Sequence, residues 1–282
     1  MTAQLSAGDY ALTANYQGDG NYQSSVSAAQ SLKIDSQGYW LAGADGEVFP
    51  LGTALPLGST EGILNAPIVG IAATPNGGGY WEVAKDGGIF SFGNAHFYGS
   101  MGGSHLNQPI VGIASTPDGG GYWEVARDAG VFTFGDAQFY GSMGNEHLNQ
   151  PIVGIATDPA TGGYWMVAGD GGIFSFNAPF LGSAGGIHLN APVVGMAATP
   201  GGGGYWKVGA DGGLFTQGNA PFLGSMGGQR LNSPVVAIQA TASGAGYRMV
   251  ASDGGLFTFG DAEFDGSTGG QPLGAPVAGI AG

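Results

Sequence analysis

The chain has 282 residues, of which 43% are hydrophobic, 9% are charged and 59 are glycine. Twenty acidic residues against six basic ones give a net charge of −14, which opposes binding to the phosphate backbone of a nucleic acid. Cysteine is absent, so no disulfides are expected, and no apolar run is long enough to span a membrane, so no membrane insertion is expected. The first residues lack the pattern of a signal peptide.

Residues 1–34 differ from the rest of the chain because they share none of its repeats. LSAGDY at 5–10 leads into an alternating strand, and YQGDGNY follows at 16–22. This text resembles the last strands of a bacterial Ig-like domain, of which it covers about a third. Two strands alone are marginally stable in water. We therefore expect this remnant to dock on the rest of the chain, to pair with another chain, or to be mobile.

From residue 38 onward, one unit recurs six times with a period of 41 or 42 residues. Each copy contains Gly-Tyr followed by Trp, an Asp-Gly or Asp-Ala pair five residues after the Trp, a Gly-Ser pair, and an apolar run after a proline. Arg248 replaces the Trp in the last copy. The repeated tyrosines are Tyr39, Tyr80, Tyr122, Tyr164, Tyr205 and Tyr247. Self-similarity at this period is typical of repeat architectures.

Each copy predicts four short strands. In the second copy, the apolar run at 67–74 indicates a strand buried on both faces, and residues 79–85 form the next strand. Asp86-Gly87-Gly88 predicts a hairpin turn before a third strand at 88–92, and HFYGS at 96–100 predicts a short fourth strand. Helical periodicity is absent. The pattern predicts an all-β fold, a six-bladed β-propeller of four-stranded blades.

Two segments compete for the inner strand of the first blade. Residues 276–281 match the inner strands of the other copies, whereas residues 31–34 lie directly before the first Gly-Tyr-Trp and do not match. We therefore expect the C-terminal strand to complete blade 1 and to close the ring. The predicted division is an Ig-like remnant at 1–34 and a six-bladed propeller at 35–282.

The repeat resembles a family of tandem repeats, with the pattern GYW–DGG–F–FGDA–F–GS, that is common in secreted and cell-wall proteins of actinobacteria. The matching text here includes Gly246-Tyr247, SDGGLFTFGDA at 252–262 and Gly266-Ser267, and the resemblance covers residues 38–282. It implies an extracellular or cell-wall location and a non-catalytic role in attachment or carbohydrate binding. The resemblance does not indicate which ligand is bound or which residues bind it.

No catalytic or cofactor motif is present in the sequence. Gly99-Ser100-Met101-Gly102 has the wrong spacing for a nucleophile elbow. Glu82 and Glu124 occupy equivalent positions in successive copies, where we expect exposed strand residues rather than a glycosidase pair. The turn aspartates, one per blade, do not converge as a calcium site requires. The repeated Trp is expected to pack between blades, with a stacking platform for sugars as the alternative.

The residues that vary between copies point to one loop face. The turns after the second strands and the loops after the Gly-Ser pairs are predicted to lie on the same side of a propeller, where binding residues are commonly placed. Three of the six cations and three of the four histidines occur there, and these candidate ligand-binding residues are Lys85, His105, Arg127, His147, His188 and Arg230.

Three functions remain open from the sequence. The first is an extracellular binding or adhesion module that recognises a glycan or cell-surface polymer through the loop face. The second is a structural spacer or self-assembly unit without a small ligand, with association through the N-terminal strands. The third is a glycoside hydrolase that uses the central channel.

Overall fold

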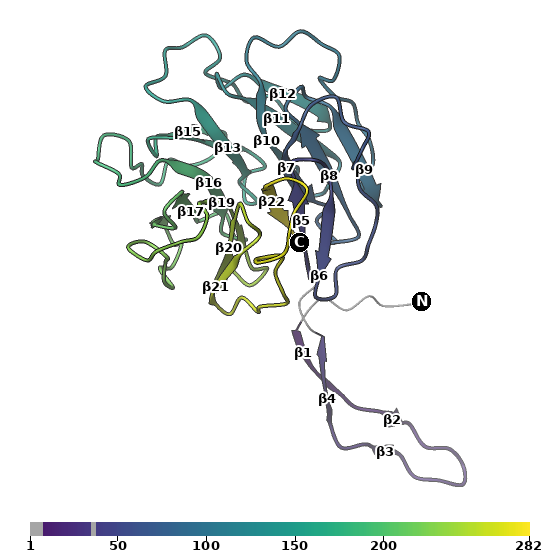
Figure 1. Cartoon of the computed structure of the whole chain (residues 1–282). Helices are drawn as coiled ribbons and strands as arrows, with labels where there is room; N and C mark the ends of the chain where they lie inside the picture. The colour runs from purple at the N-terminus through teal and green to yellow at the C-terminus, as the bar shows by residue number, and fades with distance from the viewer. Residues whose placement is uncertain (1–7, 35–37) are drawn as a thin grey trace.

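The computed structural model describes residues 8–34 and 38–282, and every regular element in these residues is a β-strand (Figure 1). Residues 38–282 form six antiparallel sheets of three strands each. We number them by their middle strands along the chain: sheet 1 is β22–β5–β6, sheet 2 is β7–β8–β9, sheet 3 is β10–β11–β12, sheet 4 is β13–β14–β15, sheet 5 is β16–β17–β18 and sheet 6 is β19–β20–β21.

Each sheet has a first, a middle and a third strand. The first strands are β7 (Ile68–Ala73), β10 (Ile110–Ser115), β13 (Ile152–Thr157), β16 (Val193–Ala198), β19 (Val235–Ala240) and β22 (Val277–Ala281). The middle strands are β5 (Tyr39–Gly43), β8 (Gly79–Ala84), β11 (Gly121–Ala126), β14 (Tyr164–Ala168), β17 (Gly204–Gly209) and β20 (Gly246–Ala251). The third strands are β6 (Val48–Leu51), β9 (Ile89–Gly93), β12 (Val131–Gly135), β15 (Ile173–Phe176), β18 (Leu214–Gly218) and β21 (Leu256–Gly260).

The first strands contact one another in cyclic order, from β22 through β7, β10, β13, β16 and β19 back to β22. Figure 1 shows them at the centre of the six sheets, with the third strands on the outside. The prediction that residues 276–281 supply the first strand of sheet 1 is confirmed, because β22 pairs with β5 from Val277–Gly43 to Ala281–Trp40. The competing segment, 31–34, pairs instead with residues 8–11.

The predicted fourth strand is wrong. Residues 96–100 and their equivalents form no strand, because their backbone groups bond to side chains instead of to a neighbouring strand. The His96 carbonyl accepts a hydrogen bond from the Trp81 indole at 2.8 Å. The Tyr122 hydroxyl of the next sheet accepts from the Tyr98 amide at 3.1 Å and donates to the Gly99 carbonyl at 2.6 Å. These bonds hold the segment against two sheets at once.

The middle strands are buried along their whole length because a neighbouring sheet covers each of their faces. The Trp of one sheet packs against the Tyr of the next, with ring centroids 5.1 Å apart for Trp40 and Tyr80 and 5.3 Å for Trp123 and Tyr164. The same contact recurs at each junction from sheet 1 to sheet 6. The expected packing role of the repeated Trp is thus confirmed.

The junction between sheets 6 and 1 uses Arg248 where the others use Trp. Its guanidinium carbon lies 4.7 Å from the centroid of the Tyr39 ring, and its Nε donates to the Glu263 carbonyl at 3.1 Å, as the indoles do elsewhere. Its Nη2 lies 3.6 Å from the carboxylate of Asp265, which takes the place of an aromatic residue or leucine in the other copies. A partly buried ion pair and a cation–π contact therefore replace the aromatic contact at the junction that completes the cycle.

Asp265→Leu is expected to lower the free energy of unfolding by about 1 to 3 kcal/mol, because the buried guanidinium of Arg248 then loses this partly exposed counter-charge. The double variant Arg248→Trp with Asp265→Leu recreates the junction between sheets 5 and 6, where Trp206 and Leu223 hold these positions. We expect it to be at least as stable as the wild type. Urea unfolding of the wild type, Asp265→Leu, Arg248→Trp and the double variant measures the interaction energy between positions 248 and 265. Effects of the two single substitutions that simply add in the double variant would contradict the ion pair.

The N-terminal strands pair with one another. β1 (Gly8–Leu12) pairs with β4 (Gln30–Ile34), and β2 (Asn15–Tyr16) pairs with β3 (Ser25–Val26). Figure 1 shows this extended hairpin pointing away from the six sheets. Over the described part of the chain there is no helix of the length and hydrophobicity needed to cross a membrane.

Candidate binding site

The turn between the middle and third strands has the same form in every sheet. In sheet 2, the Gly88 amide donates to the Asp86 carboxylate at 3.1 Å, and Gly87 adopts a left-handed conformation with φ of 80°. A Cβ atom at Gly87 would lie 2.6 Å from the Cβ of Met101, so glycine is also required by space. Equivalent bonds are made by Asp45, Asp128, Asp170, Asp211 and Asp253. The prediction that these aspartates shape hairpin turns is confirmed.

The backbone of the first residue of each turn joins the start of its own sheet to the first strand of the next sheet. The Arg127 amide donates to the Pro109 carbonyl at 2.9 Å, and the Arg127 carbonyl accepts from the Ile152 amide of the next sheet at 3.0 Å. The same two bonds occur at all six turns, where the first residues are Ala44, Lys85, Arg127, Gly169, Ala210 and Ser252. Because only the backbone is used, the side chain at this position varies without disturbing the fold.

Lys85 and Arg127 lie beside each other in this cycle. The Lys85 carbonyl accepts from the Ile110 amide, and the Pro109 carbonyl accepts from the Arg127 amide, so the two turns bond to consecutive residues. Both side chains are exposed. The other four turns place Ala, Gly, Ala and Ser at this position. Among the six turns, therefore, only two adjacent ones carry a positive charge at this position.

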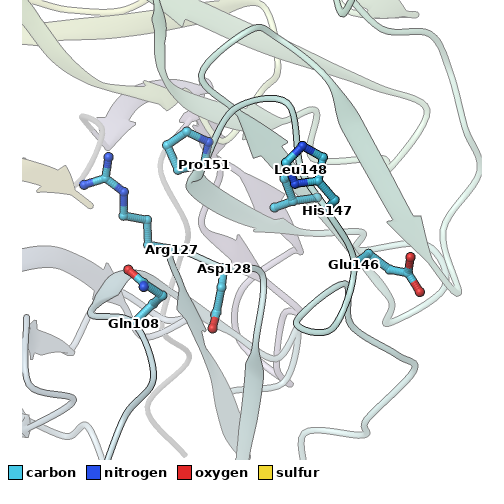
Figure 2. A pocket seen from close by; sticks show the side chains of 7 residues that line it. All are labelled: Gln108, Arg127, Asp128, Glu146, His147, Leu148 and Pro151. Carbon is cyan, nitrogen blue, oxygen red and sulfur yellow. The ribbon is translucent and has the colours of Figure 1, made fainter.

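A cavity of about 310 Å³ opens at the Arg127 turn (Figure 2). Figure 2 shows Arg127 and Gln108 on one side of it and His147 with Leu148 on the other. The loop of residues 142–151 is held against the turn by a bond from the Met143 amide to the Ala129 carbonyl at 3.2 Å. The complete lining is Gln108, Arg127, Asp128, Glu146, His147, Leu148 and Pro151. One cation, two carboxylates, an amide, an imidazole and apolar groups therefore meet in one open space.

The other sheets repeat this frame without the same side chains. In sheet 4, the positions of Arg127 and Glu146 hold Gly169 and Ile187. In sheet 2, the position of Gln108 holds Ala66. Sheet 3 alone among the six combines a cation, an amide and a histidine at these positions, and we name this set the Arg127 cavity.

The turn of the Arg127 cavity is also strained. Ala129 has φ of 68° at a position where the other five sheets have glycine with positive φ. A left-handed conformation costs a residue with a side chain roughly 1–2 kcal/mol. Strained backbone of this kind concentrates at functional sites.

The structure brings together two of the six residues that the sequence singled out. Arg127 and His147 line the same cavity, whereas Lys85, His105, His188 and Arg230 are exposed on the equivalent turns and loops outside it. Sequence reasoning missed Gln108, Glu146 and Leu148. The signal for Gln108 was its place directly before Pro109, whose carbonyl binds the Arg127 amide.

The expectation that Glu82 and Glu124 are exposed is wrong. Both have no exposed surface, because each points from a middle strand against the loop and turn of the preceding sheet. Glu82 Oε2 accepts from the Thr60 hydroxyl at 3.1 Å, and Glu124 Oε1 accepts from the Met101 amide at 3.4 Å. They occupy two separate junctions, 1–2 and 2–3, so they do not form the carboxylate pair of a glycosidase.

Burial dominates the acid–base properties of these two residues. Loss of water raises the pKa of Glu82 to about 7, with a smaller effect from Asp45, and that of Glu124 to about 8, with a smaller effect from Asp86. Lys207 holds the same strand position at the junction of sheets 4 and 5, where burial lowers its pKa to about 8 and its Nζ donates to the Gly171 carbonyl at 3.2 Å.

Within residues 8–34 and 38–282, histidine, aspartate and glutamate side chains do not gather in groups of three or more that would hold a metal ion. No protein-family model matches the chain. Comparison with curated proteins likewise finds no match. The candidate site therefore rests on its own geometry.

Proposed function

We propose that the six sheets are the blades of a six-bladed β-propeller with three-stranded blades. Its support is the cyclic contact of the first strands and the continuous series of backbone bonds through the six turns. Propellers present loops from a rigid frame, which suits recognition of a ligand on one face.

On this fold, the chain acts as an extracellular, non-catalytic binding module that recognises a glycan bearing a carboxylate group through the Arg127 cavity. The observation that carries this proposal is the gathering of Arg127, Gln108 and His147 around one cavity in a frame that five other sheets share without that combination. The extracellular location rests on the resemblance of the repeat to cell-wall proteins.

The chemistry of the cavity fits a carboxylated sugar. The planar guanidinium of Arg127 matches a carboxylate through two parallel hydrogen bonds. Asp128 is already bonded to the Gly130 amide at 3.0 Å, and Glu146, Gln108 and His147 bond to the sugar hydroxyl groups. Leu148 and Pro151 supply apolar contact. The net charge of −14 repels a polyanion, so the ligand carries isolated carboxylates rather than a continuous anionic backbone.

A glycan array with neutral and uronic- or sialic-acid-terminated sugars tests this function. We expect retention of carboxylated glycans, and a loss of affinity of at least about tenfold in Arg127→Ala, because a charge-assisted hydrogen bond contributes roughly 1.5–3 kcal/mol. Calorimetric titration of the best glycan measures the change.

Arg230→Ala is the matched control, since Arg230 is exposed on the equivalent loop of sheet 5 but does not line the cavity. Its affinity should equal that of the wild type. Absence of binding to every carboxylated glycan, or equal binding by Arg127→Ala, would overturn the proposal. The first of these results favours the alternative of a structural spacer.

A further inference from the structure

A phenylalanine recurs at one exposed position in five of the six copies. It lies two residues before the Gly-Ser pair, in the segment after the third strand of each of sheets 2 to 6. The exposed fractions are 53% for Phe97, 59% for Phe139, 62% for Phe180, 62% for Phe222 and 59% for Phe264. In sheet 1 the position holds Pro56. These five residues are named the phenylalanine series.

Packing does not explain why this residue repeats. The neighbouring Tyr98 packs against the Tyr122 ring at 5.8 Å, and the carbonyl of Gly99 binds the Tyr122 hydroxyl. Phe97 and its four equivalents belong to none of the buried apolar clusters that the described residues form. An aromatic ring that stays exposed at the same place in five copies offers a free apolar face for contact with a partner.

Each phenylalanine lies in a segment that also carries a polar residue. Three residues earlier, an exposed Asn or Asp follows the third strand, at Asn94, Asp136, Asn177, Asn219 and Asp261. The side chains of Asn94, Asn219 and Asp261 accept hydrogen bonds from threonine hydroxyls of their own sheets, so they do not extend the ring surface. The exposed ring face by itself matches a neutral pyranose, which offers C–H groups on its faces.

The size and arrangement of the series decide between partners. An exposed Phe offers roughly 100 Å² of apolar area, since a whole side chain buries about 150–250 Å². A stable protein partner or a second copy needs about 800 Å² per side in one patch. The five residues instead lie on five successive sheets around the cycle, as separate small sites. Separate, identical and weak sites suit a polymer of identical units, whose contacts add through multivalency.

Charge narrows the class of polymer. The net charge of −14, with Asp136, Asp261 and Glu263 in these same segments, repels anionic polymers and anionic lipid surfaces. We propose that the phenylalanine series is a multivalent binding surface for a neutral polysaccharide, distinct from the Arg127 cavity. One polysaccharide chain bridges neighbouring sites, or several chains of a network each occupy one.

Affinity electrophoresis in gels containing soluble hydroxyethyl cellulose or glycol chitin, with sedimentation on insoluble cellulose and chitin, tests the proposal. Variants carry Phe→Ala at one, three or all five positions. We expect retention by at least one of these neutral polymers to fall at each step, with a total loss of about 100-fold or more in the fivefold variant. Because the rings are exposed, the thermal midpoint should not change.

Ile187→Ala is the control, since Ile187 is 58% exposed on a loop outside the series. Arg127→Ala is a second control, because it impairs only the carboxylate site and so separates failure of that site from failure of this one. Both should bind the polymer as the wild type does. The proposal fails if the wild type binds none of the four polymers or if the fivefold variant binds equally. Loss of an oligomer in the fivefold variant by sedimentation velocity, without any polymer binding, would assign the series to self-association instead.

Discussion

Removal of residues 276–282 is expected to abolish the cooperative unfolding transition. The deletion takes away β22, whose Val277, Ile280 and Ala281 are buried, and it exposes Tyr39 and Leu41 of sheet 1. Burial of each larger aliphatic side chain contributes about 1.5–3 kcal/mol, and the contacts of β22 with β7 and β19 are lost as well. The sum is comparable to the roughly 5–15 kcal/mol that keeps a protein folded.

Deletion of residues 1–34 is the matched control. These strands pair only with one another in the sheet pattern, so the shortened chain should unfold at the same urea concentration as the full chain. Circular dichroism and tryptophan fluorescence during urea titration follow both deletions. A cooperative transition of unchanged midpoint without β22 would mean that another segment replaces it, with residues 31–34 the first to test.

Replacement of both Glu82 and Glu124 by Met is expected to remove most of the pH dependence of stability between pH 4.5 and 8. The pKa of each carboxyl is raised from 4.5, to about 7 and about 8, so the folded state holds protons that the unfolded state has released. The stability that these two protonated carboxyls allow is therefore fully present below pH 4.5. It is lost as pH rises from 4.5 to the folded-state pKa values. Between pH 4.5 and its own folded-state pKa, each carboxyl lowers the free energy of unfolding by about 1.4 kcal/mol per pH unit.

Methionine is the chain's own apolar choice at this strand position, as Met166 and Met249 show in sheets 4 and 6. The double variant should accordingly exceed the wild type by several kcal/mol at pH 8 and approach it near pH 4.5. Urea unfolding at intervals of half a pH unit measures the difference. Glu82→Gln with Glu124→Gln separates charge from packing, because the amide removes the titration but keeps the shape. Parallel curves for wild type and variants would contradict the assignment.

Much of the fold follows from the sequence because turn and core chemistry is local. Asp86-Gly87 specifies a turn through its own hydrogen bond and a left-handed glycine, and the repeat phase correctly assigns residues 276–281 to sheet 1. The fourth strand was mispredicted because an apolar, aromatic segment has the composition of a strand. What prevents pairing is non-local: hydroxyl and indole groups that occupy its backbone come from the Trp of its own sheet and the Tyr of the next.

The candidate site was predictable only in part. Arg127 stands out from its equivalents in the aligned repeats, whereas His147 shares its position with His105 and His188. Gln108 enters the cavity from the loop before β10 and needs the three-dimensional frame. The burial of Glu82 and Glu124 was missed because strand alternation suggests one solvent-facing side. In these sheets both faces of the middle strand are covered, so alternation carries no information about exposure.

The pairing of β22 with β5 also determines how the chain responds to mechanical tension. The two strands are antiparallel, and Trp40, near the start of β5, pairs with Ala281 at the end of β22. Force applied between the segments that enter at Tyr39 and leave after Ala281 therefore pulls on adjacent ends of one strand pair. The hydrogen bonds are loaded one after another, as in a zipper, and not together as in shear. Sheet 1 is thus the point at which the cycle of six opens first under load.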